Sequence, residues 1–170
     1  MDKMSLIVFE KTGHVLGAFT RAAAPEAAVE PAEVAGEGVW IRDAESGERL
    51  FTVEPQHLKV ETVDRRDAVL LAHLRFALVD GLPQENVVIS GIVLTATQIT
   101  VQIGPPAPAV LKAWVQVEGG PGGDRVVLQV TIPQGANSGN AAVTFNPGDY
   151  TVLVLVPGFR TFIDPVVPVP

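Results

Sequence analysis

Few residues of this chain have side chains that could carry out chemistry, and they are scattered. The three histidines are His14, His57 and His73, and they lie far apart in the sequence. Catalysis requires titratable groups that converge and whose pKa values are shifted by their surroundings. The histidine spacing is typical of neither a metal site nor a catalytic site. We therefore expect histidines of surfaces or interfaces rather than ligands or general bases.

The other reactive residue types lead to the same expectation. The absence of cysteine excludes disulfides, zinc–thiolate sites and cysteine nucleophiles, and no serine lies in a Gly-x-Ser-x-Gly motif. Asp43, Glu45 and Glu48 cluster in one predicted turn and could hold a weakly bound calcium ion. No further ligand follows at a regular spacing, so a solvated acidic turn is preferred. We expect a protein that is not an enzyme, with no catalytic residue, no metal site and no cofactor.

Aromatic and apolar residues at exposed positions are stronger candidates for function, because tryptophan often anchors protein interfaces. Trp114 shares a predicted strand face with polar residues, and Trp40 lies between two aliphatic residues of another predicted strand. The tail 162–170 is interrupted by prolines, which suits an edge strand or an arm lying along a neighbouring protein. The interface candidates are Trp114, Trp40, Phe162, Val166, Val167 and Val169. For Trp114 the alternative is a ring that closes one end of the hydrophobic core.

The composition indicates a folded, acidic protein rich in strands. The chain has 170 residues, 47% of them hydrophobic and 18% charged, with a mean hydropathy of +0.30, which excludes disorder for most of it. The 16 glycines and 14 prolines favour a chain of strands and turns over a helical bundle. The net charge of −7 leaves no basic surface for nucleic acid or anionic membranes.

Targeting signals are absent from the sequence as it stands. The apolar run Leu6 to Phe9 is too short for the core of a signal peptide. No apolar stretch approaches the ~20 residues that a membrane-spanning helix requires. We expect no membrane insertion and a cytoplasmic location.

Three changes of composition organise the chain. Residues 22–37 contain only Ala, Pro, Glu, Val and Gly, and their two prolines favour a mobile acidic loop with at most one helical turn. Residues 104–108, Gly-Pro-Pro-Ala-Pro, predict a stiff connector, and residues 119–124 predict a Gly-rich turn. We therefore expect one domain over residues 1–103 and a second over residues 109–170.

Strand patterns follow one another through the first domain. The predicted strands are 6–10, 14–20, 39–43, 48–53, 58–63 and 99–103. The first two flank a short loop whose Gly13 can adopt a positive φ, and they predict a hairpin. The next two predict a second hairpin. The last two alternate apolar with polar residues, as strands with one solvent-exposed face do. The first domain is therefore expected to be a small sheet or a barrel-like domain.

Residues 65–80 are ambiguous. Their Leu and Ala content favours a helix, which Asp64 could cap and Gly81 could end. A helical wheel places His73 and Arg75 on nearly opposite sides, however, and leaves no continuous apolar stripe. As a strand, the segment would have one apolar face and would carry His73 and Arg75 on the other. The apolar face would hold Leu70, Ala72, Leu74, Phe76 and Leu78. We favour a long strand over the helix.

The second domain has the same strand character. Segments 111–118, 125–132 and 141–145 are predicted strands, and segment 150–156 carries apolar side chains on both faces. The last of these should therefore be buried on both sides of its sheet. The Pro-interrupted tail can form only an edge strand or an arm.

One stretch of this domain resembles a known family. A strand, a Pro-Gly turn, a Tyr-Thr pair, a second strand and a Gly-aromatic pair are found here at Pro147, Gly148, Tyr150, Thr151, Gly158 and Phe159. This pattern resembles carboxypeptidase regulatory-like and transthyretin-like β-sandwiches, over residues 107–164 only. The resemblance implies an immunoglobulin/transthyretin-like sandwich that binds, spaces or supports rather than catalyses.

We therefore expect an all-β chain: a small N-terminal sheet domain followed by a β-sandwich. The expected function is that of a non-enzymatic structural or assembly protein, a subunit or adaptor of a larger complex. A phage-tail-like particle assembled in the cytoplasm is one concrete setting. Its partners would be proteins, through self-assembly or a hetero-complex, because an apolar chain of small domains has surface to bury against neighbours. The alternative is a carbohydrate- or peptide-binding sandwich that uses loops 119–124 and 134–140.

Overall fold

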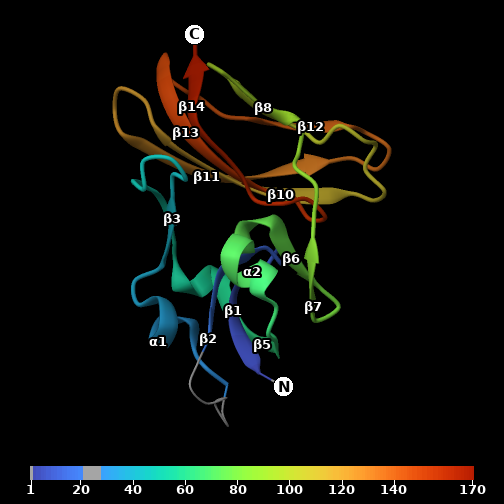
Figure 1. The fold of residues 1–170 in the computed structure, drawn as a ribbon. Coiled ribbons are helices and arrows are strands. Elements are labelled where there is room, and N and C mark those ends of the chain that lie inside the picture. Colours follow the sequence, from blue (N-terminus) through green and yellow to red (C-terminus); the bar gives the residue numbers. More distant parts are fainter. Residues whose placement is uncertain (1, 21–27) are drawn as a thin grey trace. The chain divides into compact units, whose positions relative to one another are not determined.

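The computed structural model describes residues 2–20 and 28–170, and it confirms the all-β fold class. Strands hold 55% of the residues and helices 10%, and the strands form several antiparallel sheets (Figure 1). The chain divides into two compact units, Met1–Asn86 and Val87–Pro170. In the described ranges no helix is long and apolar enough to cross a membrane.

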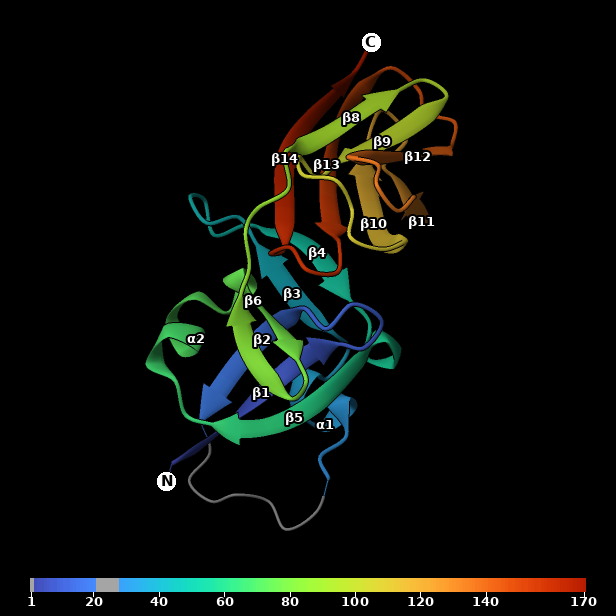
Figure 2. The same ribbon diagram turned by 90° about the vertical axis from the view of Figure 1, so that its right-hand side faces the viewer.

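The first unit is built around a three-stranded sheet with two accompanying hairpins. Its elements are β1 (Lys3–Phe9), β2 (Val15–Thr20), α1 (Pro31–Ala35), β3 (Val39–Arg42), β4 (Arg49–Val53), the 3-10 turn η1 (Pro55–His57), β5 (Leu58–Asp64), α2 (Asp67–Ala72), the 3-10 turn η2 (His73–Arg75), β6 (Phe76–Val79) and β7 (Leu82–Glu85). The sheet has the order β2-β1-β5, which Figure 2 shows side by side, and both pairings are antiparallel. The hairpins are β3–β4 and β6–β7. The hairpin predicted around Gly13 and the one predicted over 39–53 are both confirmed.

Strand β1 lies at the centre of this unit and is buried on both faces. One face contributes to a hydrophobic core with residues of β2, β5, α2 and β6. The buried members of that core are Met4, Leu6, Val8, Val15, Val63, Val69 and Phe76. The opposite face of β1 is also buried, at Ser5, Ile7 and Phe9. A middle strand with two covered faces explains why its sequence is a continuous apolar run rather than an alternating one.

The turn between β1 and β2 depends on a glycine. Gly13 has a φ of 77°, and its carbonyl oxygen accepts a hydrogen bond of 2.7 Å from the backbone N–H of Leu78. A Cβ atom at position 13 would lie 2.9 Å from the Leu78 carbonyl oxygen. Glycine is therefore required here both for the positive φ and for the close approach of β6.

Residues 65–80 differ from the long strand that we favoured. They form helix α2, then η2, and only Phe76–Val79 is a strand. The helix needs no apolar stripe, because Val69 is its one buried residue, while Leu71 is 86% exposed. The Leu- and Ala-rich composition correctly indicated a helix in this segment, and the long strand favoured from its periodicity was wrong.

The acidic Ala/Pro/Glu segment lies partly outside the described residues. Of the loop predicted over 22–37, residues 22–27 are not described. Within the remainder, Pro31–Ala35 forms the single helical turn α1, with proline in its first turn. Proline is tolerated there because the first N–H groups of a helix lack an intrahelical partner.

The second unit is a β-sandwich. Its strands are β8 (Gly91–Thr95), β9 (Gln98–Gln102), β10 (Leu111–Gly119), β11 (Asp124–Ile132), β12 (Ser138–Ala142), β13 (Gly148–Leu155) and β14 (Phe162–Val169). They form a four-stranded sheet of order β11-β10-β13-β14 and a three-stranded sheet of order β12-β9-β8. Buried residues of both sheets, among them Val101, Val115 and Val154, form one hydrophobic core. The predicted sandwich is thus confirmed, and β14 is an edge strand as expected.

The division between the units differs from the boundary that we expected at 104–108. That Gly/Pro segment lies inside the sandwich, where Ala107 is buried and exchanges backbone hydrogen bonds with residues 135 and 136. Strand β9, assigned from sequence to the first domain, pairs with β12 and supplies sandwich core residues. A long-range pairing of this kind leaves no local signal in the sequence.

Strand β13 carries the motif on which the family resemblance rests. Tyr150 is 1% exposed, its hydroxyl donates a hydrogen bond of 2.9 Å to the carbonyl oxygen of Asn146, and its ring lies 5.0 Å from that of Phe145. Both faces of the strand are buried, including Leu153 and Leu155, as predicted. The strand predicted over 141–145 is instead β12, which ends at Ala142.

Candidate functional site

The β3–β4 hairpin positions the side chains of the candidate site. The side chain of Asp43 accepts a hydrogen bond of 2.7 Å from the backbone N–H of Glu45, and the Gly47 N–H donates to the Asp43 carbonyl at 3.0 Å. Gly47 has a φ of 71°, which the turn requires. The Asp43 carboxylate is therefore used to build the turn. In the described ranges, no group of three acidic or histidine side chains could hold a metal ion.

The hairpin has one buried and one exposed face. Ile41, Phe51 and Val53 are each no more than 2% exposed. Trp40 lies on the opposite face of β3 and is 53% exposed. The buried face anchors the hairpin in the first unit, while the indole is held at the surface.

Two arginines converge on this indole. The guanidinium carbon of Arg42 lies 5.4 Å from the centroid of the Trp40 ring, and that of Arg49 lies 5.1 Å from it. Both distances are within the range of a cation–π contact. Nη1 of Arg42 also donates a hydrogen bond of 2.9 Å to the Gly47 carbonyl oxygen, which fixes its orientation. We call these three residues, Trp40, Arg42 and Arg49, the Trp40 surface.

Neither arginine has a carboxylate partner in the part of the chain that the structure describes. Ion pairs of 4.0 Å or less join other cations of both units to acids, for example Lys3 to Asp64 at 2.6 Å and Arg65 to Asp67 at 2.9 Å. No such pair involves Arg42 or Arg49. In a chain with 19 acidic against 12 basic residues, the guanidiniums of the Trp40 surface remain available to an external anion.

A cavity of about 220 Å³ adjoins the Trp40 surface. Its lining is apolar except for one guanidinium and one imidazole: Leu16, Trp40, Ile41, Arg42, His73 and Leu74. Burial lowers the pKa of His73, because an imidazolium would lose hydration there. Its imidazole is therefore neutral near pH 7, and the positive charge at the cavity comes from arginine.

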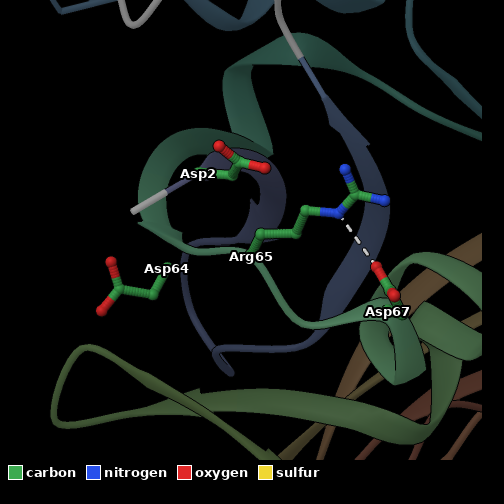
Figure 3. Close-up of a pocket in the computed structure, with 4 residues that line it drawn as sticks. All are labelled: Asp2, Asp64, Arg65 and Asp67. Atoms are coloured by element: carbon green, nitrogen blue, oxygen red, sulfur yellow. Dashed lines mark hydrogen bonds and ion pairs between the residues drawn. The ribbon is translucent and has the colours of Figure 1, made fainter.

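A second cavity, of about 380 Å³, is lined by Asp2, Asp64, Arg65 and Asp67 (Figure 3). Figure 3 shows Arg65 directed toward Asp67, with which it pairs, while Asp64 points away from both. Asp64 instead accepts a hydrogen bond of 2.6 Å from Lys3, which lowers the pKa of its carboxyl group. Two of the three carboxylates of this cavity, those of Asp64 and Asp67, are thus paired with separate cations.

The histidines do not converge, and all three are buried or half-buried. His14 is completely buried, and its Nδ1 lies 2.7 Å from Oγ1 of Thr12. The His57 ring stacks on Phe9 with the ring centroids 5.9 Å apart. For His14 the expected surface or interface position is wrong, because the ring packs inside the first unit.

The remaining interface candidates occupy different environments in the second unit. Trp114 and Phe162 are half-buried, and Val166 is 60% exposed. Val167 and Val169 are buried members of the sandwich core, which removes them from the surface. The tail is therefore a strand of this fold, paired with β13, and only Val166 of its three valines is displayed.

Comparisons with protein-family models, with curated proteins and with solved structures found no match. The evidence for the candidate site is therefore its geometry.

Of the three residues of the Trp40 surface, only Trp40 was predicted from the sequence, and Arg42 and Arg49 were not. Arg42 could have been found, because residues two apart on a strand share a face.

Proposed function

We propose that this chain is a non-enzymatic structural or assembly protein, a subunit or adaptor that binds other proteins through the Trp40 surface. The observation that carries the proposal is the exposed indole of Trp40, held on the β3–β4 hairpin between two arginines that form no ion pair with the described carboxylates.

Residue chemistry supports a protein partner. Tryptophan and arginine are the residue types most enriched among the few side chains that dominate binding energy at protein interfaces. An indole buries a large apolar area on binding while losing little side-chain entropy. The cation–π contacts also orient both guanidiniums before any partner arrives, which reduces the entropic cost of binding.

Several acidic side chains form ion pairs, which supports the proposal that the protein is not an enzyme. Asp64 and Asp67 are exposed, Glu61 is half-buried, and each of the three forms an ion pair with a cation. A general acid or base needs a carboxyl group in a cavity with a pKa shifted toward neutrality. The pKa of the Asp64 carboxyl group is lowered instead, mainly by its hydrogen bond with Lys3.

Site-specific photo-crosslinking tests this proposal. A photoreactive amino acid replaces Trp40 in one variant and Gln129, an exposed residue of β11, in a matched control. Both are expressed in cells that naturally produce the chain, irradiated, and analysed by mass spectrometry. We expect position 40 to capture a defined protein partner, either another chain or a second copy, that position 129 does not. Equal, diffuse capture from both positions would contradict the proposal.

A further inference from the structure

The Trp40 surface combines three features that together specify the chemistry of a ligand. It presents two fixed guanidiniums, an exposed aromatic ring and an adjoining apolar cavity. A ligand complementary to all three must carry negative charge and an apolar group close to each other.

The two guanidinium groups indicate that the ligand is negatively charged. Arg42 and Arg49 are direct neighbours across the hairpin, so two positive charges are held together, and neither forms an ion pair with an acid of residues 2–20 or 28–170. Guanidinium groups bind carboxylates through charge-assisted, often bidentate hydrogen bonds. Because the rest of the chain is strongly acidic, a negatively charged ligand is attracted to this surface and repelled by most others.

The cavity indicates that the ligand also carries an apolar group. Leu16, Ile41 and Leu74 contribute aliphatic walls, and a volume of about 220 Å³ accommodates one apolar side chain. Arg42 lines the cavity and also contacts the indole, so a group entering the cavity lies beside a guanidinium. The neutral imidazole of His73 adds no charge that would oppose an apolar occupant.

We infer that the Trp40 surface binds an acidic segment of a partner protein, with an apolar side chain in the cavity and neighbouring carboxylates on Arg42 and Arg49. This inference rests on the proposed function and names the chemistry of its partner. A segment in which Leu or Phe is flanked by Asp or Glu has the required combination. An inorganic anion satisfies the arginines but leaves the cavity and the indole uncovered.

Nuclear magnetic resonance on the full chain tests the inference. The chain contains two tryptophans, so its indole N–H spectrum has two signals, and Trp40→Phe identifies that of Trp40. The probe is a synthetic peptide with one Leu flanked by Asp residues, titrated to millimolar concentration. We expect the Trp40 signal to shift in a saturable way, and the Trp114 signal to stay in place. Arg42→Gln or Arg49→Gln should weaken binding about tenfold each, the loss expected for one charge-assisted hydrogen bond.

Matched controls make each part of the inference falsifiable. Arg65→Gln removes the same charge from an arginine already paired with Asp67, so it should leave the peptide affinity unchanged. Peptides with Asn in place of Asp, or Ala in place of Leu, should bind more weakly, and inorganic phosphate should produce no comparable shift. The inference is overturned if no shift occurs, if the Asn peptide binds equally, or if phosphate alone reproduces the shift. If position 40 captures a protein partner and the acidic peptide nonetheless fails, only the partner chemistry is wrong and the proposed function stands.

Discussion

Arg42 and Arg49 are paired across the β3–β4 hairpin, so two like charges face each other on adjacent strands. Like charges at directly opposed positions destabilise a hairpin. The two contacts with Trp40, at 5.4 and 5.1 Å, offset part of this cost. Local conflicts of this kind are expected at functional sites, which agrees with the binding role proposed for the Trp40 surface.

The two aromatic residues of the hairpin should differ in their contribution to stability. Trp40→Ala should lower the free energy of unfolding by no more than about 1 kcal/mol, because the indole is 53% exposed and contributes mainly cation–π contacts. Phe51→Ala, on the buried face and 1% exposed, should cost about 3–5 kcal/mol. Chemical denaturation of both variants measures the two values. Similar losses in the two variants would mean that Trp40 is a structural residue.

The Gly13 turn should tolerate no side chain. Gly13→Ala combines a positive φ with a Cβ atom 2.9 Å from the Leu78 carbonyl oxygen. Gly81→Ala is the matched control, because its φ is 76° and a Cβ atom there has nothing within 4 Å. The control should cost about 1–2 kcal/mol from backbone strain, and Gly13→Ala should cost more. Equal losses in thermal or chemical unfolding would show that the approach of β6 to this turn is not tight.

The hydroxyl group of Tyr150 should stabilise the sandwich. Tyr150→Phe removes only the 2.9 Å hydrogen bond to the Asn146 carbonyl oxygen and keeps the ring against Phe145. The expected loss in unfolding free energy is about 1–2 kcal/mol, that of a buried hydrogen bond whose acceptor is left without its donor. Tyr150→Ala should cost several times as much, since it also removes a ring from the core. An unchanged stability of Tyr150→Phe would contradict this role of the hydroxyl group.

His73 should make the stability of the protein depend on pH. Burial holds the pKa of His73 below its ordinary value, whereas the unfolded chain retains that value, about 6.5. Between the two pKa values the unfolded state binds more protons, so the free energy of unfolding falls as the pH drops below about 6.5. Denaturation between about pH 7 and about pH 5.5 should therefore show a smaller loss for His73→Leu than for the wild type. An identical pH dependence of the two proteins would exclude this contribution.

Local patterns predicted the local structure well. The hairpin at Gly13 and the doubly buried strand β13 follow from turn residues and strand periodicity, which act over a few neighbours. Helix α2 was missed because a short helix that buries only Val69 has no periodic pattern to detect. The place of β9 in the sandwich was missed because its pairing with β12 joins segments that are distant in the sequence.

The candidate site was only half predictable for a geometric reason. Trp40 was recognised by residue type, but regular pairing would place Leu50 opposite Arg42. A register shift after Ile41 skips Leu50 and brings Arg49 opposite Arg42 instead. A bulge of this kind redirects side chains and is not evident from alternation alone. The ion pair between Lys3 and Asp64 was also not predicted, because it depends on the register in which β1 pairs with β5.

The central claim, that the Trp40 surface holds this chain in a protein complex, is tested most directly by the size of the native particle. Wild-type chain and Trp40→Ala are expressed in the cells that naturally produce it, and each extract is analysed by size-exclusion chromatography with light scattering. We expect the wild type to elute in a complex larger than the 18.0 kDa chain and the variant to elute as the folded monomer. Elution of both proteins as monomers, or of both in the same complex, would contradict the claim.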